Sequence, residues 1–496
     1  MKYDYVVIGA GVSGMSTAII LAKNGFEVAL VEKSKKTAPL IRGFTRNKVY
    51  FDTGFHHTGS FGEGEVLDTL FHYLGLSDKL EKLPFNQDGF DLLRCLETGF
   101  EFQFPSGYER IRQRLSDTFA GESRAINEYL QAVKDGFNSF PYLKLETDQL
   151  DMSIQKTAQG PSLQQVLDNL TDNTALKWVL SIHCLLHGVL PEEVPFDYHA
   201  CVVGSYYESV HSIKGGGRSL ARAYDGVLKE RGVDIYCGLG VSEIRFSADH
   251  CPTEVRLADG TGLKCRNCIS TVHPRELLRL VPDSIFRPAY RNRLQRLEET
   301  SSIYILYAGC RVLPESMTGS NILVTPGWHM TESLEKGPLE KRPLYLCSTQ
   351  QANDRPELSG LIGIVPAPRN QTLQWTDTFA GKRPADYAQF KEKIRIRLQQ
   401  HIERCLPEIE GNIEFSECST PLTLRDFANN PCGSVYGVKH KVGQHNPVPL
   451  TKSKGLFLAG QAVVAAGVMG AVISAFVVCG FILGHKQLIR QVQEFK

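Results

Sequence analysis

Residues 3 to 33, "YDYVVIGAGVSGMSTAIILAKNGFEVALVEK", decide the fold of this chain. The apolar run at the start of this stretch is typical of a buried parallel strand, and apolar residues at helical spacing follow it. Gly9, Gly11 and Gly14 lie between the two, in the spacing of a turn that leads from a strand into a helix. A second apolar strand ends on Glu32. The stretch therefore predicts a βαβ unit.

This βαβ unit has the features of an adenine dinucleotide site. The first glycine of such a turn makes the bend, the second lets the backbone approach a pyrophosphate, and the third lets helix and strand pack closely. The start of the helix offers unpaired N–H groups to phosphate oxygens. Glu32 can accept hydrogen bonds from both ribose hydroxyls, and its charge would repel a 2′-phosphate, which argues against NADP. Ser13 at the helix start and Lys33 after the strand belong to the predicted site.

A second glycine-rich segment, "KGLFLAGQAVVAAGVMGAVISAFVVCG", favours FAD over NAD. It predicts a strand at 456–459, a glycine turn, and an apolar helix from about Val468. A second helix start would thus reach the same sheet. A flavin needs such a contact because its ribityl chain and ring extend beyond the first pyrophosphate site. The alternative is a plain C-terminal helix hairpin.

Composition excludes several classes of function. The chain has 496 residues, with 55 Lys and Arg against 54 Asp and Glu, so no basic excess indicates nucleic-acid binding. Its 13 cysteines form no repeating framework, which favours a reduced, cytoplasmic setting. Residues 5–22 and 456–483 carry no charge, but glycine turns explain both better than a signal peptide or a transmembrane span.

Several further motifs resemble the phytoene desaturase superfamily of FAD-dependent enzymes, and within it the retinol saturase and carotenoid isomerase branch. They are "FDTGFHHTG", "HGVLPEEVPFDYHA", "ISTVHP", "TPLTLRDFANNPCGSVYG" and "LFLAGQ…AAGVMGA", and they follow one another over most of the chain. The resemblance implies an α/β fold: a Rossmann-like FAD-binding domain of the glutathione reductase type with a discontinuous α+β substrate domain. It also implies saturation, desaturation or isomerisation of double bonds in a lipophilic polyene or isoprenoid.

The resemblance further implies roles for single residues. Asp52 and Gly54 would lie near the flavin, and Val241 would present its backbone to the adenine. The family usually has paired glycines after the second strand; this chain has "TAPLIRGFTR" there, where Arg42 or Gly43 would compensate. The C-terminal contacts would be Gly460 and Gln461 at the ribityl–phosphate and Gly467, Val468, Met469 and Gly470 near the ring.

Two adjacent histidines, His56 and His57, are the candidate catalytic residues. They could be metal ligands, a proton-transfer pair or part of a packed corner. His183 and His187 are spaced like ligands on a helix but lack an acidic partner, so no metal is predicted. Saturating a double bond needs a hydride from flavin N5 and a proton from elsewhere. Imidazole titrates near neutrality, so either histidine could donate that proton.

The expected substrate pocket is apolar and aromatic, with Tyr206, Tyr207 and Tyr304 on its wall. The electron donor or acceptor is unknown. A lipophilic substrate also predicts peripheral contact with a membrane. Two alternatives stay open: an amine oxidase, with Cys432 as a possible covalent flavin attachment, and a non-catalytic escort of prenylated clients. The intact glycines and Glu32 argue against the escort.

The pattern of elements predicts two interleaved domains. The FAD-binding domain would comprise 1–75, 206–290 and 412–496, and the substrate domain 76–205 and 291–411. The first part of the substrate domain has mostly helical periodicity, and the second begins with a β-like run.

Overall fold

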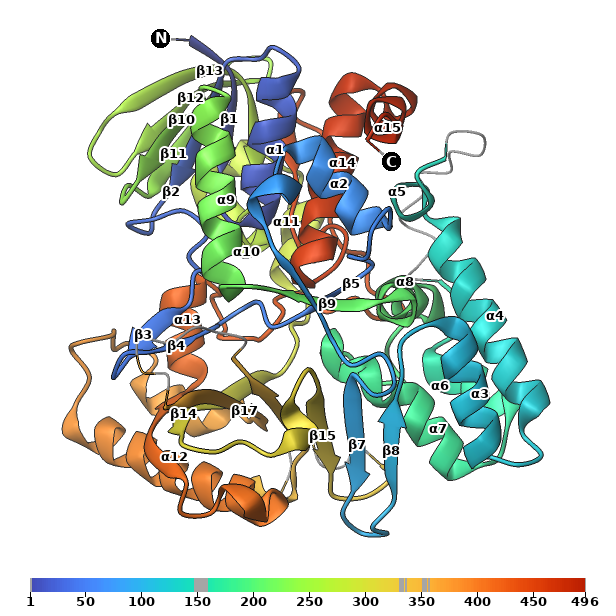
Figure 1. The fold of residues 1–496 in the computed structure, drawn as a ribbon. Coiled ribbons are helices and arrows are strands. Elements are labelled where there is room, and N and C mark those ends of the chain that lie inside the picture. The colour runs from blue at the N-terminus through green and yellow to red at the C-terminus, as the bar shows by residue number, and fades with distance from the viewer. Residues whose placement is uncertain are drawn as a thin grey trace.

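The computed structural model divides the chain between two large sheets (Figure 1). The first sheet has the order β10–β2–β1–β13–β12–β11, with β19 paired to β13. Its strands are β1 (Lys2–Ile8), β2 (Val28–Glu32), β10 (Asp234–Cys237), β11 (Val241–Phe246), β12 (Pro252–Leu257), β13 (Gly262–Ser270) and β19 (Leu456–Leu458). The residues that the structure describes are 2–146, 159–329, 334, 337–349, 355 and 357–495.

The predicted βαβ unit lies at the centre of this sheet. β1 pairs in parallel with both β2 and β13, and β19 pairs in parallel with the end of β13. Helix α1 (Val12–Lys23) begins after Gly11 and ends at Asn24, just before Gly25 at φ +85°. Helices α1, α9 (Gly216–Glu230) and α14 (Gly467–Leu483) share one apolar core with the sheet. The glycine turn after β1 and the turn after β19 therefore meet at the same edge.

The second sheet is mostly antiparallel, with the order β18–β14–β17–β16–β15–β7–β8. One face of this second sheet packs against helix α12 (Ala385–Cys405), and the opposite face is turned toward the domain that contains the first sheet. Its strands are β7 (Asp91–Cys95), β8 (Glu101–Phe104), β14 (Ser302–Cys310), β15 (Asn321–Thr325), β16 (Leu344–Ser348), β17 (Ser359–Ala367) and β18 (Ile413–Ser419). Because β18 belongs here, the predicted FAD-domain segment 412–496 begins with a strand of the other domain.

Helices between the two sheets close one side of the molecule, as the helical periodicity before residue 205 predicts. They bury a shared core that includes Trp178, Tyr129 and Tyr207. α6 begins with a capping box in which Ser162 and Gln165 satisfy each other's backbone N–H groups. The helices are α3 (Tyr108–Thr118), α4 (Ser123–Ser139), α5 (Pro141–Lys144), α6 (Leu163–Leu170), α7 (Thr174–Ser181) and α8 (Phe196–Glu208).

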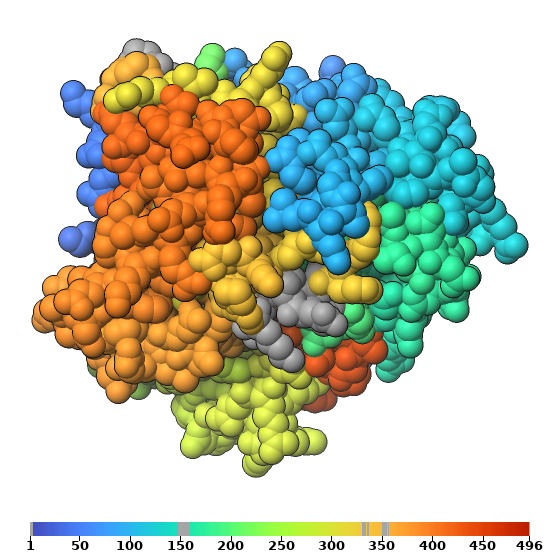
Figure 2. Space-filling view, turned by 90° about the horizontal axis from the view of Figure 1, so that it is seen from below, coloured from blue at the N-terminus to red at the C-terminus, as the bar shows by residue number. Residues whose placement is uncertain are grey.

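Shorter elements connect the domains. A three-stranded sheet, β5–β9–β6, crosses from one to the other. Figure 2 shows the face where α12 lies beside β7, and there Arg94 donates to the carbonyl of Cys405 (2.8 Å). The connecting elements are β3 (Phe44–Arg46), β4 (Val49–Phe51), β5 (Thr58–Gly59), α2 (Val66–Leu74), β6 (Lys82–Pro84), β9 (Val210–Ile213), α10 (Pro274–Leu280), α11 (Pro288–Gln295), α13 (Pro421–Ala428) and α15 (His485–Gln493).

The apolar segment near the C-terminus forms a strand, a turn and a buried helix, as predicted. α14 has 17 residues, fewer than the roughly 20 that a bilayer requires. Among the described residues, no helix combines the length and apolar character needed to cross a membrane.

Candidate active site

A cavity of about 840 Å³ runs from the glycine turn of the first sheet to the second sheet. Fourteen of the residues predicted for the cofactor, the catalytic step or the substrate line it. They are Gly9, Gly11, Ser13, Glu32, Gly54, His56, His57, Tyr206, Gly460, Gln461, Gly467, Val468, Met469 and Gly470. Residues predicted near the N-terminus and near the C-terminus of the chain therefore line one continuous cavity.

The glycine turn after β1 has the shape that a pyrophosphate requires. A Cβ on Gly14 would lie 1.8 Å from the carbonyl oxygen of Gly9, so helix α1 approaches the strand as closely as backbone allows. A Cβ on Gly11 would meet nothing within 4 Å, so the cavity side of the turn is open. Gly9 adopts φ +101°, where a side chain would be strained.

Glu32 closes the turn from the end of β2. One carboxylate oxygen accepts the N–H of Ala10 (2.9 Å) and the other accepts the N–H of Ser34 (2.8 Å). The side chain is nearly buried but lines the cavity. Each carboxylate oxygen can accept more than one hydrogen bond. Glu32 thus fixes the turn and can still accept from ribose hydroxyls, which fits the ADP half of a dinucleotide.

The second turn, after β19, lies on the other side of the cavity. Gly460 adopts φ +105°, and its N–H donates to Ser474 on α14 (2.7 Å). A Cβ on Gly470 would lie 2.5 Å from the carbonyl oxygen of Ala465, so the start of α14 folds tightly back on its own turn. Both turns therefore offer backbone to one ligand, as a long dinucleotide such as FAD requires.

His440 is a cavity residue that the sequence did not reveal. Its Nε2–H donates to the carbonyl of Gln461 (2.8 Å), and its ring stacks on Tyr198 with centroids 4.5 Å apart. Burial lowers the pKa of His440 to about 4. It lies in a loop without periodicity, where spacing gives no signal. His440 therefore holds the second turn as a neutral ring.

Six of the residues predicted for the cofactor do not line the cavity: Gly14, Lys33, Arg42, Gly43, Asp52 and Val241. Arg42 instead pairs with Asp225 (2.8 Å). Asp52 accepts the N–H of Gly217 (2.8 Å) and the hydroxyl of Tyr50 (2.9 Å), and burial raises the pKa of Asp52 to about 6. Asp52 thus anchors the start of helix α9, one layer behind the cavity.

The adjacent histidines have different surroundings. The His57 ring packs against Phe85, Tyr206 and Tyr345, and its Nδ1 lies 3.4 Å from the Tyr345 hydroxyl. The Nε2 atom of His57 is covered by protein and has no hydrogen-bond partner among the described residues. The His56 ring also lines the cavity, and burial lowers its pKa to about 3. His56 is therefore neutral at pH 7, contrary to the premise that it titrates near neutrality.

The second sheet forms the floor of the cavity, and its register explains which side chains face inward. Ile305, Ile364, Tyr345 and Leu323 lie opposite one another on four neighbouring strands and all line the cavity. Cross-strand partners point to the same face of a sheet. This row therefore makes an apolar surface with one hydroxyl group.

Two predicted wall residues face elsewhere. Tyr304 follows Ile303 on β14, so it points to the opposite face, where its hydroxyl donates to Gln371 (2.5 Å). Tyr207 follows Tyr206 on α8, and one helical step turns it into the protein core, where its hydroxyl lies 3.4 Å from that of Tyr129. Of the three predicted tyrosines, Tyr206 alone lines the cavity.

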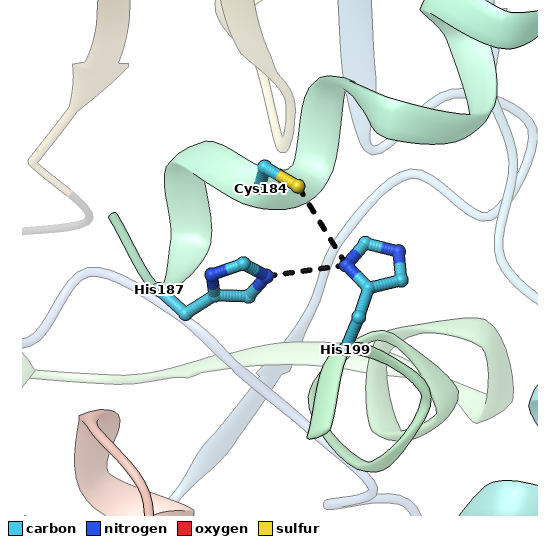
Figure 3. A group of neighbouring side chains, drawn as sticks. All are labelled: Cys184, His187 and His199. Carbon is cyan, nitrogen blue, oxygen red and sulfur yellow. Dashed lines mark hydrogen bonds between the residues drawn. The ribbon is translucent and has the colours of Figure 1, made fainter. Parts of the chain in front are cut away.

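Three side chains with metal-ligand atoms cluster where the 3-10 helix Ile182–Leu186 approaches α8 (Figure 3). They are Cys184, His187 and His199. The N–H of Val189 donates to His187 Nδ1 (3.3 Å), so the proton of His187 is on Nε2, which donates to His199 Nδ1 (3.1 Å). His199 Nε2 in turn lies 3.3 Å from the Tyr129 hydroxyl. The ring nitrogens are thus engaged with each other, and we assign no metal to the cluster.

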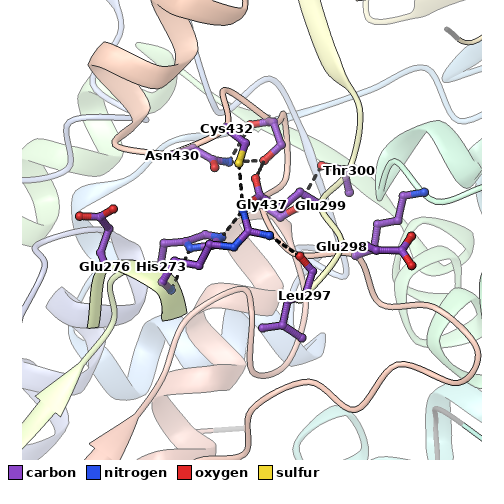
Figure 4. A network of polar contacts seen from close by, with 12 residues as sticks. His273, Glu276, Leu297, Glu298, Glu299, Thr300, Asn430, Cys432 and Gly437 are labelled. Atoms are coloured by element: carbon purple, nitrogen blue, oxygen red, sulfur yellow. Dashed lines mark hydrogen bonds and ion pairs between the residues drawn. The ribbon is translucent and has the colours of Figure 1, made fainter. Parts of the chain in front are cut away.

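Cys432, the candidate for covalent flavin attachment, points away from the cavity into a polar network (Figure 4). Its Sγ accepts from Arg275 (3.0 Å), whose guanidinium also pairs with the buried Glu299 (2.7 Å). The other Glu299 oxygen accepts from the Ser434 hydroxyl (2.8 Å). Burial raises the pKa of Cys432, which keeps the thiol protonated. The network holds loop 429–438 against the start of β14.

The fold and the cavity define an FAD-dependent oxidoreductase, in which the two glycine turns line one cavity beside apolar strands. The chain belongs to the family described as flavin containing amine oxidoreductase, which it matches over residues 12–482. FAD is the cofactor of this class. The residues lining the first turn would hold its ADP half, and those of the second turn would hold the remainder.

Known proteins with similar sequences act on polyenes, according to their names. All-trans-retinol 13,14-reductase of Danio rerio is 24% identical and aligns with 98% of this chain and 86% of its own length. The 4,4'-diapolycopene oxygenase of a Methylomonas species is 24% identical over 87% of each chain.

Solved structures of low identity share the fold. Putrescine oxidase bound to putrescine has a TM-score of 0.65 at 13% identity, covering 97% of this chain and 99% of its own. Rab GDI of Plasmodium falciparum has a TM-score of 0.54 at 11% identity, covering 98% of this chain and 99% of its own. Both confirm the predicted fold class.

Proposed function

We propose that this enzyme transfers a hydride to or from a carbon–carbon bond of a lipophilic polyene or isoprenoid. The apolar, ring-lined floor that continues directly from the dinucleotide turns carries this proposal. The names of the retinol reductase and diapolycopene oxygenase relatives support the substrate class. Bound FAD supplies the redox chemistry, because its ring accepts or gives the hydride.

The protein supplies a dry, oriented chamber and one site for a proton. The floor residues Ile305, Ile364 and Leu323 offer apolar surface along which an extended hydrocarbon can lie. The neutral His56 ring lines the cavity with one N–H and one lone pair, whereas the His57 ring packs against Phe85, Tyr206 and Tyr345. We therefore favour His56 over His57 as the group that exchanges a proton with the substrate.

The test is turnover by the purified, FAD-loaded protein with all-trans-retinol, an acyclic carotenoid and putrescine, followed by flavin absorbance and product mass. We expect a double bond to be gained or lost in a polyene, and no turnover of the amine. His56→Gln should lower turnover at least tenfold more than His57→Gln. Turnover of putrescine alone would make the enzyme an amine oxidase, and a protein that binds no flavin would be an escort.

We also infer a cytoplasmic location with peripheral membrane contact, through which a lipophilic substrate would reach the cavity. Helix α13 supports this, because Leu424 and Ala428 on one side line the cavity while Phe427 is 64% exposed. Co-sedimentation with phosphatidylcholine and phosphatidylglycerol vesicles tests the contact. We expect Phe427→Ser to weaken it, whereas Leu450→Ser, at another exposed apolar site, should not. Failure of the native protein to sediment with either vesicle contradicts the inference.

A further inference from the structure

A buried carboxylate lies behind the apolar floor of the cavity. Asp91 begins β7 with no exposed surface, and it accepts hydrogen bonds from Asn321 Nδ2 (2.8 Å) and His183 Nε2 (3.1 Å). Burying a carboxylate is costly unless it is well paired, and an apolar group of similar size is often at least as stable. The function proposed above makes no use of this charge.

Strand register places Asp91 on the cavity side of the second sheet. Asp91 lies opposite Asn321 on β15, and Leu323, two residues further along β15, belongs to the floor of the cavity. Residues two apart on a strand point to the same face and are about 7 Å apart. Asp91 therefore lies one row behind the floor, facing the same way as Leu323.

The side chains above this row are affected by the carboxylate. Burial lowers the pKa of His57, and Asp91 opposes that shift. Burial raises the pKa of Tyr206 and of Tyr345, and Asp91 adds to both shifts. The three rings line the cavity and carry no charge at neutral pH. Asp91 is thus a negative charge behind a neutral wall.

Other charged side chains line the cavity at different places. Glu32 is at the first glycine turn, and Asp197 is in the first turn of α8. Lys441 is on the loop before β19, where its charge is offset by Glu193 (3.7 Å) and Glu298 (2.9 Å). None of these belongs to the floor of the second sheet.

We propose that Asp91 is a positioning residue that gives the cavity a preference for positive charge on a bound polyene. This rests on the proposed function. When a C–H bond loses its hydrogen as hydride, both bonding electrons go to oxidised FAD and a cation remains on the carbon chain. Loss of a proton from the neighbouring carbon then forms the double bond. In the reverse direction a proton would add first, and the cation that it leaves on the carbon chain would accept a hydride from the reduced cofactor.

The test compares two ligands on the FAD-loaded protein without any turnover. One is farnesyl-trimethylammonium, and the other is its neutral isostere with a tert-butyl group. A ligand charge that lies one contact distance beyond the floor row is about 10 Å from the carboxylate. At an effective dielectric constant of about 20, this distance predicts that the native protein binds the cation on the order of 10-fold more tightly. Asp91→Asn should bring the ratio of the two dissociation constants close to one.

A matched control separates charge from general disturbance. Asp68 is another buried carboxylate, and it pairs with Lys82 (2.5 Å), but it does not line the cavity. Asp68→Asn should therefore keep the native ratio. His183→Gln leaves the Asp91 carboxylate in place, so this variant should also keep the native ratio of the two dissociation constants. If Asp91→Asn does not retain FAD, Asp91→Leu combined with His183→Leu replaces the pair by apolar groups and should give the same loss.

Specific results would overturn this proposal. A native ratio near one does so, as does an unchanged ratio in Asp91→Asn, or an equal loss in Asp68→Asn or His183→Gln. The proposed function fails independently, when the native protein prefers the cation but converts no polyene.

Discussion

Gly14→Ala is expected to destabilise the protein itself, whereas Gly11→Ala should act on cofactor binding alone. A Cβ on residue 14 would lie 1.8 Å from the carbonyl oxygen of Gly9 and 3.0 Å from its carbonyl carbon. Helix α1 must therefore move away from β1 by about 1.6 Å before an ordinary contact is restored. Overpacking of a rigid core costs about 1–3 kcal/mol, and a clash with backbone lies at the upper end.

Residue 11 provides the matched control because the same methyl group there meets nothing within 4 Å and its φ is −73°. The assay is thermal unfolding of both variants with and without FAD, together with the flavin retained after gel filtration. Gly14→Ala should unfold several degrees below the native protein in both forms. Gly11→Ala should match the native protein without FAD but retain at least tenfold less flavin. Native-like unfolding of Gly14→Ala would refute the reasoning.

Three further predictions follow from the site. Burial lowers the pKa of His56 to about 3 and of His440 to about 4, so the unfolded chain gains protons between about pH 6.5 and 4 that the folded protein does not. The unfolding temperature should therefore fall as the pH is lowered over this range, and it should stay flat above pH 7. Asp52 offsets part of the loss of stability, because its pKa is raised to about 6 in the folded protein. A rise of the unfolding temperature on acidification would contradict this prediction. Acid precipitation should release all flavin, because Cys432 points away from the cavity; coloured pellets would disprove it. Tyr304→Phe should keep turnover within about twofold, measured with the polyene substrate, and a larger loss would return Tyr304 to the wall.

The cofactor half of the site was predictable because its signals are local. A strand, a glycine turn, a helix and a terminal acid lie within residues 3–33, and each glycine has a steric reason visible in the spacing. The second turn, at 460–470, is equally short. The order of strands in the sheet brings the two turns together. The sequence therefore predicted the fold class and both turns, and the binding of FAD by the residues of these turns stays a prediction.

The substrate wall was less predictable because β14 is apolar on both faces. All nine residues from Ser302 to Cys310 are buried, one face against helix α12 and the other against the cavity. The pattern of polar and apolar residues therefore does not show which side chains of β14 point to the cavity, and Tyr304 was assigned to the wrong face of the sheet. Asp91 gave no signal for a different reason: its place behind the floor depends on pairing with β15, which lies far away in sequence.

The packing of α1 against α14 has a consequence for biosynthesis. Both helices contribute to one apolar core, and the thiol of Cys479 on α14 lies 3.9 Å from the carbonyl of Thr17 on α1. A ribosome completes residues 12–23 long before it reaches 467–483, so the oily side of the first helix has no native neighbour during most of translation. Nascent chains in this condition are prone to aggregate, and chaperones exist to shield them. The cavity, which the starts of both helices line, is thus completed only when synthesis is almost finished.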